Sequence, residues 1–284
     1  MKNVIRWFRD LFVGIGLHWK RTLFEFAAAF SLIWTFVEGS AYLLQLQPPK
    51  DWRLFWATFG GSLFAALWRS WRPRSVVFKI DHTNTKIKLS FGDLFEQNGL
   101  RAVSVNEFFD SALGKVVSHQ SLHGILLTRC FGGHAAAFDK ELERDLAACE
   151  GEDVQRTEGK TRRYPIGTTA LIKSNQDKYL LFALARTDTA THKASSDVGT
   201  MWEAMKALWR RARNECGGDG IHVALVGSGL SGIGIPNREL LNLIILSAIT
   251  ETKLGRITNE IHIVLRQTLF DEIDLREIEK HWTN

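Results

Sequence analysis

Residues 223–236 read Val223-Ala224-Leu225-Val226-Gly227-Ser228-Gly229-Leu230-Ser231-Gly232-Ile233-Gly234-Ile235-Pro236. An apolar run typical of a buried strand leads into four glycines within eight residues, and a helical pattern follows over residues 238–250. Glycine permits positive φ and lets backbone N–H groups approach an anion closely, while the N-terminus of a helix carries partial positive charge. The stretch therefore predicts a cradle for a phosphate group; the alternative is a plain strand-to-helix turn.

Two other nucleotide-binding motifs fit the sequence poorly. Gly227, Gly229 and Gly232 match the Gly-x-Gly-x-x-Gly spacing of a Rossmann unit. That motif normally opens a series of βαβ units, whereas only one further strand, over residues 260–265, follows here. A Walker-type loop would need glycine five residues before Gly159-Lys160-Thr161, where the chain has Val154. The glycine stretch is therefore a late loop of its domain.

The composition limits the classes of protein that the chain can belong to. Its 284 residues suffice for one sizeable core and an appendage. Cys130, Cys149 and Cys216 lack the spacing of a metal or redox motif, so we interpret them as reduced thiols and expect no metal site. The net charge of +5 comes mostly from basic clusters that flank apolar segments, which indicates a membrane protein rather than a nucleic-acid-binding one.

The first 72 residues have the features of a membrane anchor. Residues 1–22, with large apolar side chains at helical spacing between basic residues, are predicted to be an interfacial amphipathic segment. Residues 23–72 contain two apolar runs, 23–46 and 52–71, each long enough to span a bilayer, joined by a Pro-Pro turn. Basic residues lie before the first run and after the second. By the positive-inside rule we expect a two-helix transmembrane hairpin in the cell inner membrane with both termini cytoplasmic.

Small residues recur at every fourth position in both predicted spans. The two stripes consist of Ala27, Ser31, Thr35 and Gly39, and of Ala57, Gly61 and Ala65. Such stripes permit close helix contact, either within the hairpin or between protomers. Glu38 lies in the outer third of the first span, where a carboxylate is costly, so it either lines a pore or reaches the nearby interface. Glu25 is expected at the cytoplasmic edge beside Arg21.

After residue 74 the sequence changes to that of an α/β domain. Periodicity predicts strands over residues 75–80, 85–90, 100–106, 168–173, 179–184, 221–226 and 260–265. Helical patterns cover residues 138–149, 200–214, 238–250 and 270–282. Residues 114–124, 150–163 and 188–199 are interpreted as loops or linkers. The interleaved order predicts a sheet of about six strands with helices on both faces, a three-layer α/β/α fold.

The order of motifs over residues 75–284 resembles a macro domain, the ADP-ribose-binding α/β/α module. The similarity rests on Gly92-Asp93-Leu94 after a strand, a strand ending in Val105-Asn106, a small-residue loop from Gly114, and the late glycine stretch. A macro domain behind a membrane hairpin is similar to the membrane-anchored effector family (ThsA) of type II Thoeris anti-phage systems. That resemblance implies that a TIR-domain partner makes a histidine-conjugated ADP-ribose signal on infection. The macro domain would bind this signal, and the membrane part would then assemble and damage the membrane.

The resemblance also implies which residues bind the ligand. Asp93 would accept a hydrogen bond from the adenine amino group, with Leu94 supplying backbone near the ring. The backbone N–H groups of residues 228–234 would surround the diphosphate and the distal ribose. The complete predicted site is Asp93, Leu94, Asn106, Gly114, Ser118, His119, Gly227, Ser228, Gly229, Leu230, Ser231, Gly232, Ile233 and Gly234. Ser118, His119, Gln120 and His123 fall where the altered loop could meet the variable end of the ligand; the alternative for them is a structural role.

We expect a ligand-gated effector without catalytic residues. Hydrolytic macro domains use an Asn-Ala-Ala-Asn run and a multi-glycine loop, whereas this chain has Val105-Asn106-Glu107-Phe108-Phe109 and Gly114-Lys115-Val116. The role of Asn106 stays open. Signal binding would select an arrangement that clusters or reorients the hairpins as a homo-oligomer in the bilayer, causing abortive infection. No cofactor and no nucleic acid are expected. The alternative is a membrane-tethered ADP-ribosyl hydrolase or ADP-ribose reader.

Overall fold

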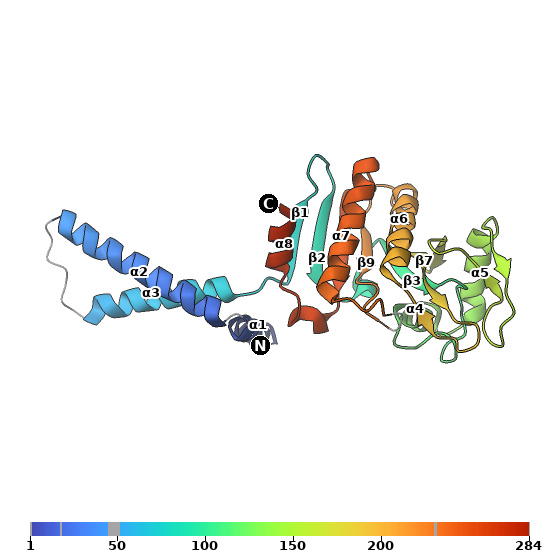
Figure 1. The fold of residues 1–284 in the computed structure, drawn as a ribbon, viewed down its shortest axis with the longest axis horizontal. Helices are drawn as coiled ribbons and strands as arrows, with labels where there is room; N and C mark the ends of the chain where they lie inside the picture. The colour runs from blue at the N-terminus through green and yellow to red at the C-terminus, as the bar shows by residue number, and fades with distance from the viewer. Residues whose placement is uncertain (1, 18, 45–51, 230–231, 284) are drawn as a thin grey trace. The chain divides into compact units, whose positions relative to one another are not determined.

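The structure is a computed structural model that describes the chain apart from residues 1, 18, 45–51, 230–231 and 284. It divides into two compact units, Met1–Pro73 and Arg74–Asn284 (Figure 1). The first unit contains helices α1 (Lys2–Leu17), α2 (Trp19–Leu43) and α3 (Trp52–Ser70). The predicted Pro-Pro turn lies outside the described residues.

Helices α2 and α3 pack along each other through aromatic and polar contacts. The rings of Phe26 and Phe59 meet edge to face with centroids 5.2 Å apart. The Glu25 carboxylate lies 3.5 Å from the Arg21 guanidinium, as predicted, and 3.0 Å from that of Arg69 on α3. Helices α2 and α3 are therefore joined by an ion pair as well as by apolar packing.

Only α2, among the helices that the structure describes, is both long and apolar enough to cross a membrane. None of its residues is buried in the unit, and it exposes large side chains such as Phe24, Leu32 and Phe36. The predicted pair of spans is thus supported for one helix. Helix α3 has 19 residues with Arg53 and Arg69 near its two ends, so any 18-residue stretch of it contains both charges.

The predicted small-residue stripes do not form the contact between α2 and α3. The buried residues of α3 are Thr58, Ser62, Ala66 and Ser70, one position along from the predicted stripe. Gly39 and Gly61 are exposed, and a Cβ atom added to either would meet nothing within 4 Å. One residue along a helix is a rotation of about 100°, so a four-residue spacing alone does not identify the contacting face. Glu38 is also exposed and forms no ion pair with a described residue.

The second unit is built on a mixed sheet in the order β1-β2-β10-β9-β3-β7-β6, with β8 paired to β7. Its strands are β1 (Ser75–Lys79), β2 (Lys86–Phe91), β3 (Leu100–Asn106), β6 (Thr169–Ser174), β7 (Asp177–Thr187), β8 (Ala194–Ser195), β9 (Ile221–Ala224) and β10 (Glu260–Leu265). Strands β2, β10, β9, β3 and β7 run parallel, so their carboxyl ends share one edge. Strands β1 and β6 pair antiparallel at the two sides.

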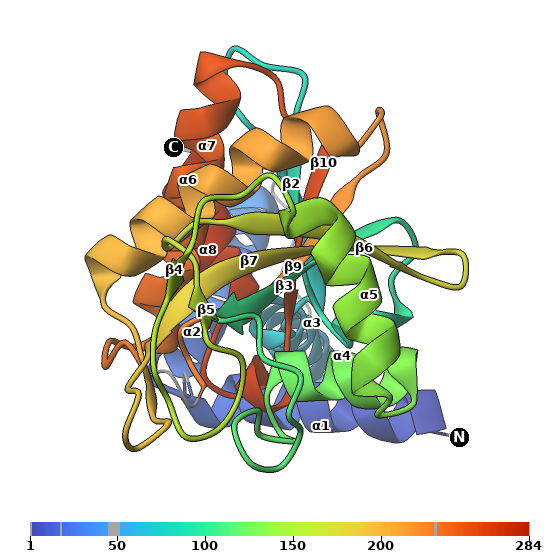
Figure 2. The same ribbon diagram turned by 90° about the vertical axis from the view of Figure 1, so that its right-hand side faces the viewer.

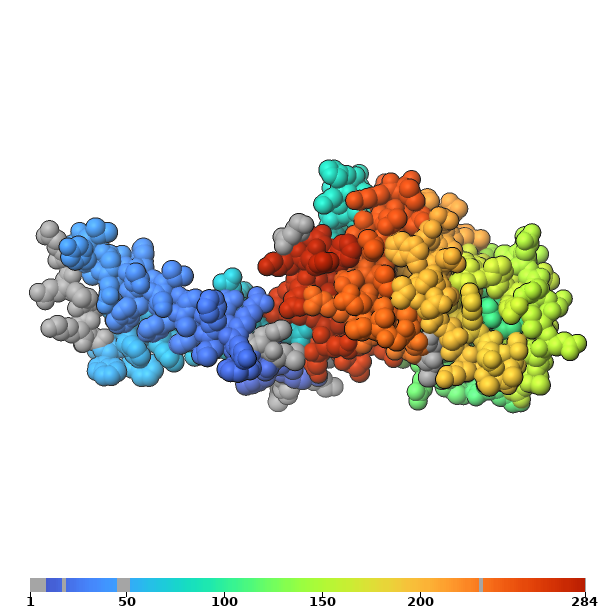
Figure 3. Space-filling model, viewed as in Figure 1, coloured from blue at the N-terminus to red at the C-terminus, as the bar shows by residue number. Residues whose placement is uncertain are grey.

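Helices cover both faces of this sheet, which confirms the α/β/α architecture (Figure 2). Helices α6 (Val198–Glu215), α7 (Asn237–Leu254) and α8 (Leu275–Thr283) bury one apolar core against it, including the fully buried Trp209. Figure 3 shows α7 and α6 as the orange and yellow surface over that face. Helices α4 (Leu122–Phe131) and α5 (Ala135–Leu146) cover the other face around a second core that includes Phe138.

Three segments differ from the sequence-based expectation. Helix α4 begins inside the predicted loop 114–124, because Ser121 caps it by accepting a hydrogen bond from the Gly124 N–H. The predicted loop 150–163 contains a short antiparallel pair, β4 (Glu152–Asp153) and β5 (Arg162–Arg163), and β8 lies in the predicted linker 188–199. The main sheet consequently has eight strands. Two-residue strands carry too little periodicity to be recognised from sequence.

Candidate ligand-binding site

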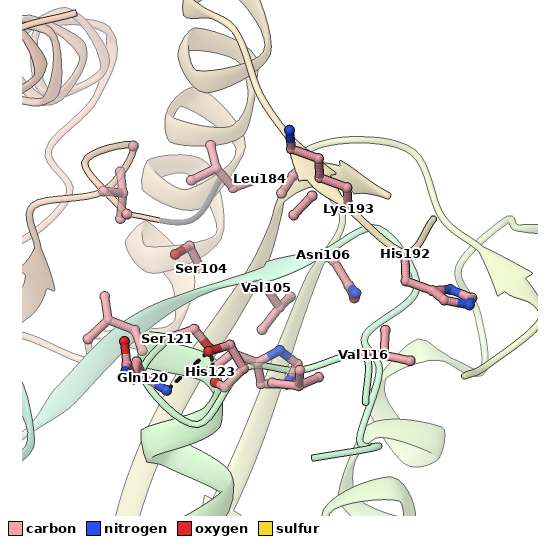
Figure 4. Close-up of a pocket in the computed structure, with 18 of the residues that line it drawn as sticks. Ser104, Val105, Asn106, Val116, Gln120, Ser121, His123, Leu184, His192 and Lys193 are labelled. Carbon is pink, nitrogen blue, oxygen red and sulfur yellow. Dashed lines mark hydrogen bonds between the residues drawn. The ribbon is translucent and has the colours of Figure 1, made fainter. Parts of the chain in front are cut away.

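A cavity of about 530 Å³ opens at the carboxyl ends of β3, β7 and β9 (Figure 4). After β3 the chain goes outward to β6 and β7, and it then returns through α6 to β9 on the other side of β3. In open α/β sheets, such a change of direction leaves a crevice at the carboxyl ends, where ligands bind. The cavity is lined by Ser104, Val105, Asn106, Val116, Val117, Ser118, Gln120, Ser121, Leu122, His123, Leu184, Ala185, His192, Lys193, Ala194, Leu225, Val226, Gly227, Gly229 and Arg266.

The glycine loop between β9 and α7 forms one wall. Gly227 has φ +83°, and a Cβ atom there would lie 2.6 Å from Ile233 Cδ1, so both conformation and space require glycine. The loop uses two of its own N–H groups, since Ile233 N donates to Gly227 O at 3.2 Å and Gly232 N to Gly229 O at 3.0 Å. The N–H groups of Ser228 and Gly229 donate to no other described residue. Of these two residues Gly229 lines the cavity, so its N–H group is free to bind an anion there.

A second wall comes from the loop that leads into α4. Ser121 Oγ donates to Ser118 O at 2.7 Å and accepts from the Gly124 N–H at 2.9 Å, which fixes the start of the helix. At Gly124, a Cβ atom would lie 2.1 Å from Ser118 O, so the loop and helix pack too closely for any side chain. The N–H groups of Leu122 and His123 have no backbone partner among the described residues. The helix therefore presents its positive end to the cavity.

Asn106, at the end of β3, is held by a buried polar cluster. Its Nδ2 donates to Asp110 Oδ2 at 2.8 Å, and its Oδ1 accepts from the Asp110 N–H at 3.1 Å. Asp110 also accepts from Arg156 Nη1 at 2.9 Å and from the Lys160 N–H at 2.7 Å. The side chains of Asp110 and Arg156 are 0% exposed. We call these residues the Asp110 cluster; it fixes the orientation of the Asn106 amide within the cavity.

Comparison with known proteins identifies the family to which this chain belongs. Residues 87–266 match the family described as Thoeris protein ThsA, Macro domain. The chain belongs to this ThsA macro-domain family. Comparison with curated protein sequences gave no significant match.

Solved macrodomain structures share the fold of the second unit. The Oceanobacillus iheyensis macrodomain with ADP superimposes with a TM-score of 0.51 at 10% identity, over 73% of this chain and 96% of that chain. A single-residue variant of that macrodomain with ADPR gives a TM-score of 0.52 at 10% identity, over 74% of this chain and 100% of that chain. At this identity the similarity concerns the fold alone.

The structure brings only some of the predicted ligand residues together. Asn106, Ser118, Gly227 and Gly229 line the cavity. The predicted residues outside its lining are Asp93, Leu94, Gly114, His119, Ser228, Gly232, Ile233 and Gly234. Leu230 and Ser231 lie outside the described residues. The ThsA macro domain therefore gathers the residues of β3, α4 and the glycine loop, but not those of the Asp93 turn.

In the Asp93 turn, the protein itself provides a hydrogen-bond donor to each oxygen of the Asp93 carboxylate. Asp93 Oδ1 accepts from the Phe95 N–H at 2.9 Å and caps the short helix η1 (Leu94–Glu96), while Oδ2 accepts from Arg129 Nη1 at 2.6 Å. Burial raises the pKa of this carboxyl, but the hydrogen bonds from Phe95 and Arg129 outweigh that effect and lower it. An adenine amino group would have to share this carboxylate with Arg129.

Sequence reasoning missed several residues that line the cavity, above all Arg266, His192 and Lys193. Arg266 directly follows β10, and a Cβ atom on Gly229 would lie 3.8 Å from its Nη2. The signal for Arg266 was present, because a basic residue directly after a buried parallel strand lies at the ligand edge of the sheet. No such signal marks His192, whose positive φ of +57° arises in the loop between β7 and β8.

His123 lies in the floor of the cavity beneath Val105 and Asn106 (Figure 4). It is 5% exposed, and its Nε2 atom has no hydrogen-bond partner among the described residues. Burial, with a smaller effect from the charge of Lys160, lowers the pKa of His123 to about 3, so its imidazole is neutral at physiological pH.

Proposed function

We propose that the macro domain of this chain is a receptor for a nucleotide of the ADP-ribose class, bound in the cavity at the carboxyl ends of β3, β7 and β9. The observation that carries this proposal is the convergence of anion-binding groups there. The N–H groups of the glycine loop, the N-terminus of α4 and the guanidinium of Arg266 all border one cavity. Groups of this kind bind diphosphate. Related folds that hold ADP and ADPR support the same ligand class.

Within this class, we propose histidine-conjugated ADP-ribose as the signal, made by a TIR-domain protein during phage infection. Membership of the ThsA macro-domain family supports this choice. The ligand acts here as a messenger, and the chain needs no cofactor of its own.

The cavity supports binding without hydrolysis. None of the described residues that line it is aspartate or glutamate, so no carboxylate is positioned as a general base. The Asn106 amide is held on both sides by Asp110, and the His123 imidazole, with a pKa lowered to about 3, is a weak base. The other histidine in the lining, His192, has its ring nitrogens 3.4 Å from Arg156 Nη2 and 3.3 Å from Thr157 Oγ1, so both are engaged within the protein. We therefore propose that the ligand is bound without activation of a water molecule over the distal ribose.

The first unit supplies the membrane part of the proposed effector. Helix α2 has the length and apolar composition of a span, and Trp52, Trp56 and Trp68 on α3 are exposed. Each of these features favours contact with lipid. The small-residue stripes face away from the α2–α3 contact, so they are available for packing between protomers. We propose a multi-pass protein of the inner membrane with cytoplasmic termini that assembles and disrupts the bilayer when the macro domain binds its signal.

The receptor proposal is tested by calorimetric titration of the full chain in detergent micelles with ADP-ribose, its histidine conjugate and NAD. Each ligand is recovered afterwards and analysed by mass spectrometry. Tight binding of the conjugate, recovered intact, is the expected result. Conversion of a ligand would instead establish the membrane-tethered hydrolase, and no binding of any ligand would overturn the receptor assignment.

Dye release from reconstituted vesicles tests the membrane step. We expect the histidine conjugate to increase leakage from vesicles that contain the full chain, and protein-free vesicles to stay sealed. Chemical cross-linking in the same vesicles should show larger assemblies only when the conjugate is present. Ligand binding without leakage or assembly would separate the receptor from the proposed effector role.

A further inference from the structure

The two outer strands of the main sheet, β6 and β1, differ in whether the protein covers their free edges. Strand β6 pairs with β7 and strand β1 pairs with β2, both antiparallel, and they stand at opposite ends of the sheet. In an antiparallel pair, alternate residues direct their N–H and C=O groups away from the neighbouring strand. An outer strand therefore presents unpaired backbone groups to which another strand can add, unless the protein covers them.

The β6 edge is closed by side chains from both helical layers. The Leu171 N–H donates to Asp145 Oδ2 of α5 at 2.8 Å. Two residues further along, the Lys173 N–H donates to Glu141 Oε2 at 3.1 Å. Four residues of a helix rise about 6 Å, close to the rise of two residues in a strand, so the two carboxylates match successive outward N–H groups. Arg211 of α6 then contacts Asp145 at 3.1 Å, which joins the helices of the two faces across this edge.

The β1 edge has no such cover among the described residues. Ile80 N donates to Thr85 O across the β1–β2 hairpin at 3.0 Å. Because successive residues of a strand alternate, the backbone groups of Ser75, Val77 and Lys79 point away from β2. None of these groups has a hydrogen-bond partner in the part of the chain that the structure describes. The side chains of the same three residues are exposed, that of Val77 by 47%.

The open edge is complementary to itself. If two copies of β1 pair antiparallel around Val77, the two valines lie opposite each other, and each Ser75 lies opposite the Lys79 of the other copy. The three outward residues of each strand then exchange N–H and C=O groups, which gives about six hydrogen bonds. A register centred on Lys79 would place two lysines opposite each other, which is destabilising. The sequence of β1 thus favours one register with a second copy.

We propose that β1 is an interaction surface for a second copy of this chain, which adds its own β1 antiparallel around Val77 and joins the two sheets edge to edge. Because the β6 edge is closed, this pairing stops at two copies and does not propagate into an open chain of sheets. Anchoring of both copies in one membrane, as proposed above, raises their effective concentration. The inference rests on the proposed assembly and names a contact surface for it within the macro domain.

Disulfide cross-linking of the full chain in vesicles tests this contact. Opposed residues in a hydrogen-bonded antiparallel pair have Cα atoms about 5.5 Å apart, a distance that a disulfide spans. We expect V77C to form a cross-linked dimer under oxidising conditions, in an amount that rises with the protein-to-lipid ratio. K173C is the matched control, because Lys173 is exposed on the closed β6 edge and should not cross-link. The native chain, with Cys130, Cys149 and Cys216, gives the background.

A second variant tests the backbone hydrogen bonds themselves. V77P removes the N–H group that a second copy would use but leaves the hydrogen bonds between β1 and β2 in place, because that N–H points away from β2. Energy transfer between labelled copies in vesicles should show association at least about tenfold weaker than for the native chain, since two backbone hydrogen bonds are lost. V77T keeps the N–H group and should associate as the native chain does. Thermal unfolding confirms that each variant is folded.

The outcomes separate this contact from the proposed function. Absence of a V77C dimer at every density, with and without the histidine conjugate of ADP-ribose, would overturn the contact. Equal cross-linking of V77C and K173C would also overturn it, because the dimers would then reflect random collision, and so would native association of a folded V77P protein. A specific V77C dimer that the conjugate does not increase would support the β1 contact and reject the proposed control of assembly by the signal.

Discussion

Two sets of polar groups near the end of β3 differ in whether the protein itself provides their hydrogen-bond partners. In the Asp110 cluster, one carboxylate with 0% exposure receives hydrogen bonds from Asn106, Arg156 and the Lys160 N–H. In the neighbouring cavity, neither His123 Nε2 nor the Gly229 N–H has a hydrogen-bond partner among the described residues. We infer that the first group maintains the fold and that the second awaits a ligand.

Removing a charge from the Asp110 cluster should give the largest effect, and it should fall on stability. In R156M, the Asp110 carboxylate would be buried without its cation, so we expect a loss of about 3 kcal/mol in the free energy of unfolding. Denaturant titration measures this loss. R129M is the control, because the Arg129–Asp93 pair is 55% and 33% exposed. That variant should lose less than about 1 kcal/mol. Equal losses in the two variants would show that the Asp110 cluster is no stronger than a surface ion pair.

A negative charge in the glycine loop should act on binding instead. A Cβ atom on Gly229 meets only Arg266 Nη2, at 3.8 Å, so G229E should fold normally. Its carboxylate would repel the diphosphate and compete for Arg266, and we expect an affinity loss of about 100-fold. G229Q has nearly the same size without the charge and should lose much less. Calorimetry that finds G229E and G229Q equally weakened would point to a steric effect and remove the electrostatic argument.

Loss of the Arg266 charge should weaken binding more moderately. We expect R266M to bind ADP-ribose about tenfold more weakly, because a charge-assisted hydrogen bond to phosphate is lost. Its affinity should also depend less on salt concentration than that of the native protein. R256M is the matched control, since Arg256 is exposed before the other end of β10. Native affinity in R266M would place the diphosphate away from β10.

The smallest expected effect concerns acid stability at the Asp93 turn. The pKa of Asp93 is lowered in the folded protein from its ordinary value of 3.8, so its contribution to stability is present above that pH and is lost on acidification below it. Because the side chain is 33% exposed, the contribution should be below about 1 kcal/mol. Urea unfolding from pH 7 to pH 3 should show a shallower acid loss for D93N than for the native protein. Superimposable pH profiles would contradict this assignment.

The sequence by itself determined the elements with strong local patterns. The alternation over residues 75–90 specified the β1–β2 hairpin, and the run of residues 221–254 specified strand, glycine loop and helix in that order. The apolar composition of residues 23–43 indicated a helix suited to lipid. These features are local, because side-chain periodicity and glycine conformation act over a few residues.

Tertiary structure decided which polar groups have hydrogen-bond partners within the protein. Arg156 and Asp110 are 46 residues apart in the chain, and no periodicity links them. The face of α3 that contacts α2 carries Thr58 and Ser62, because the orientation of a helix depends on its neighbours as well as on its own spacing. His123 was one of several polar residues in a segment interpreted as a loop. Only the packing of α4 against β3 and α5 buried its imidazole without a partner, since burial and hydrogen bonding depend on distant residues that the local sequence does not contain.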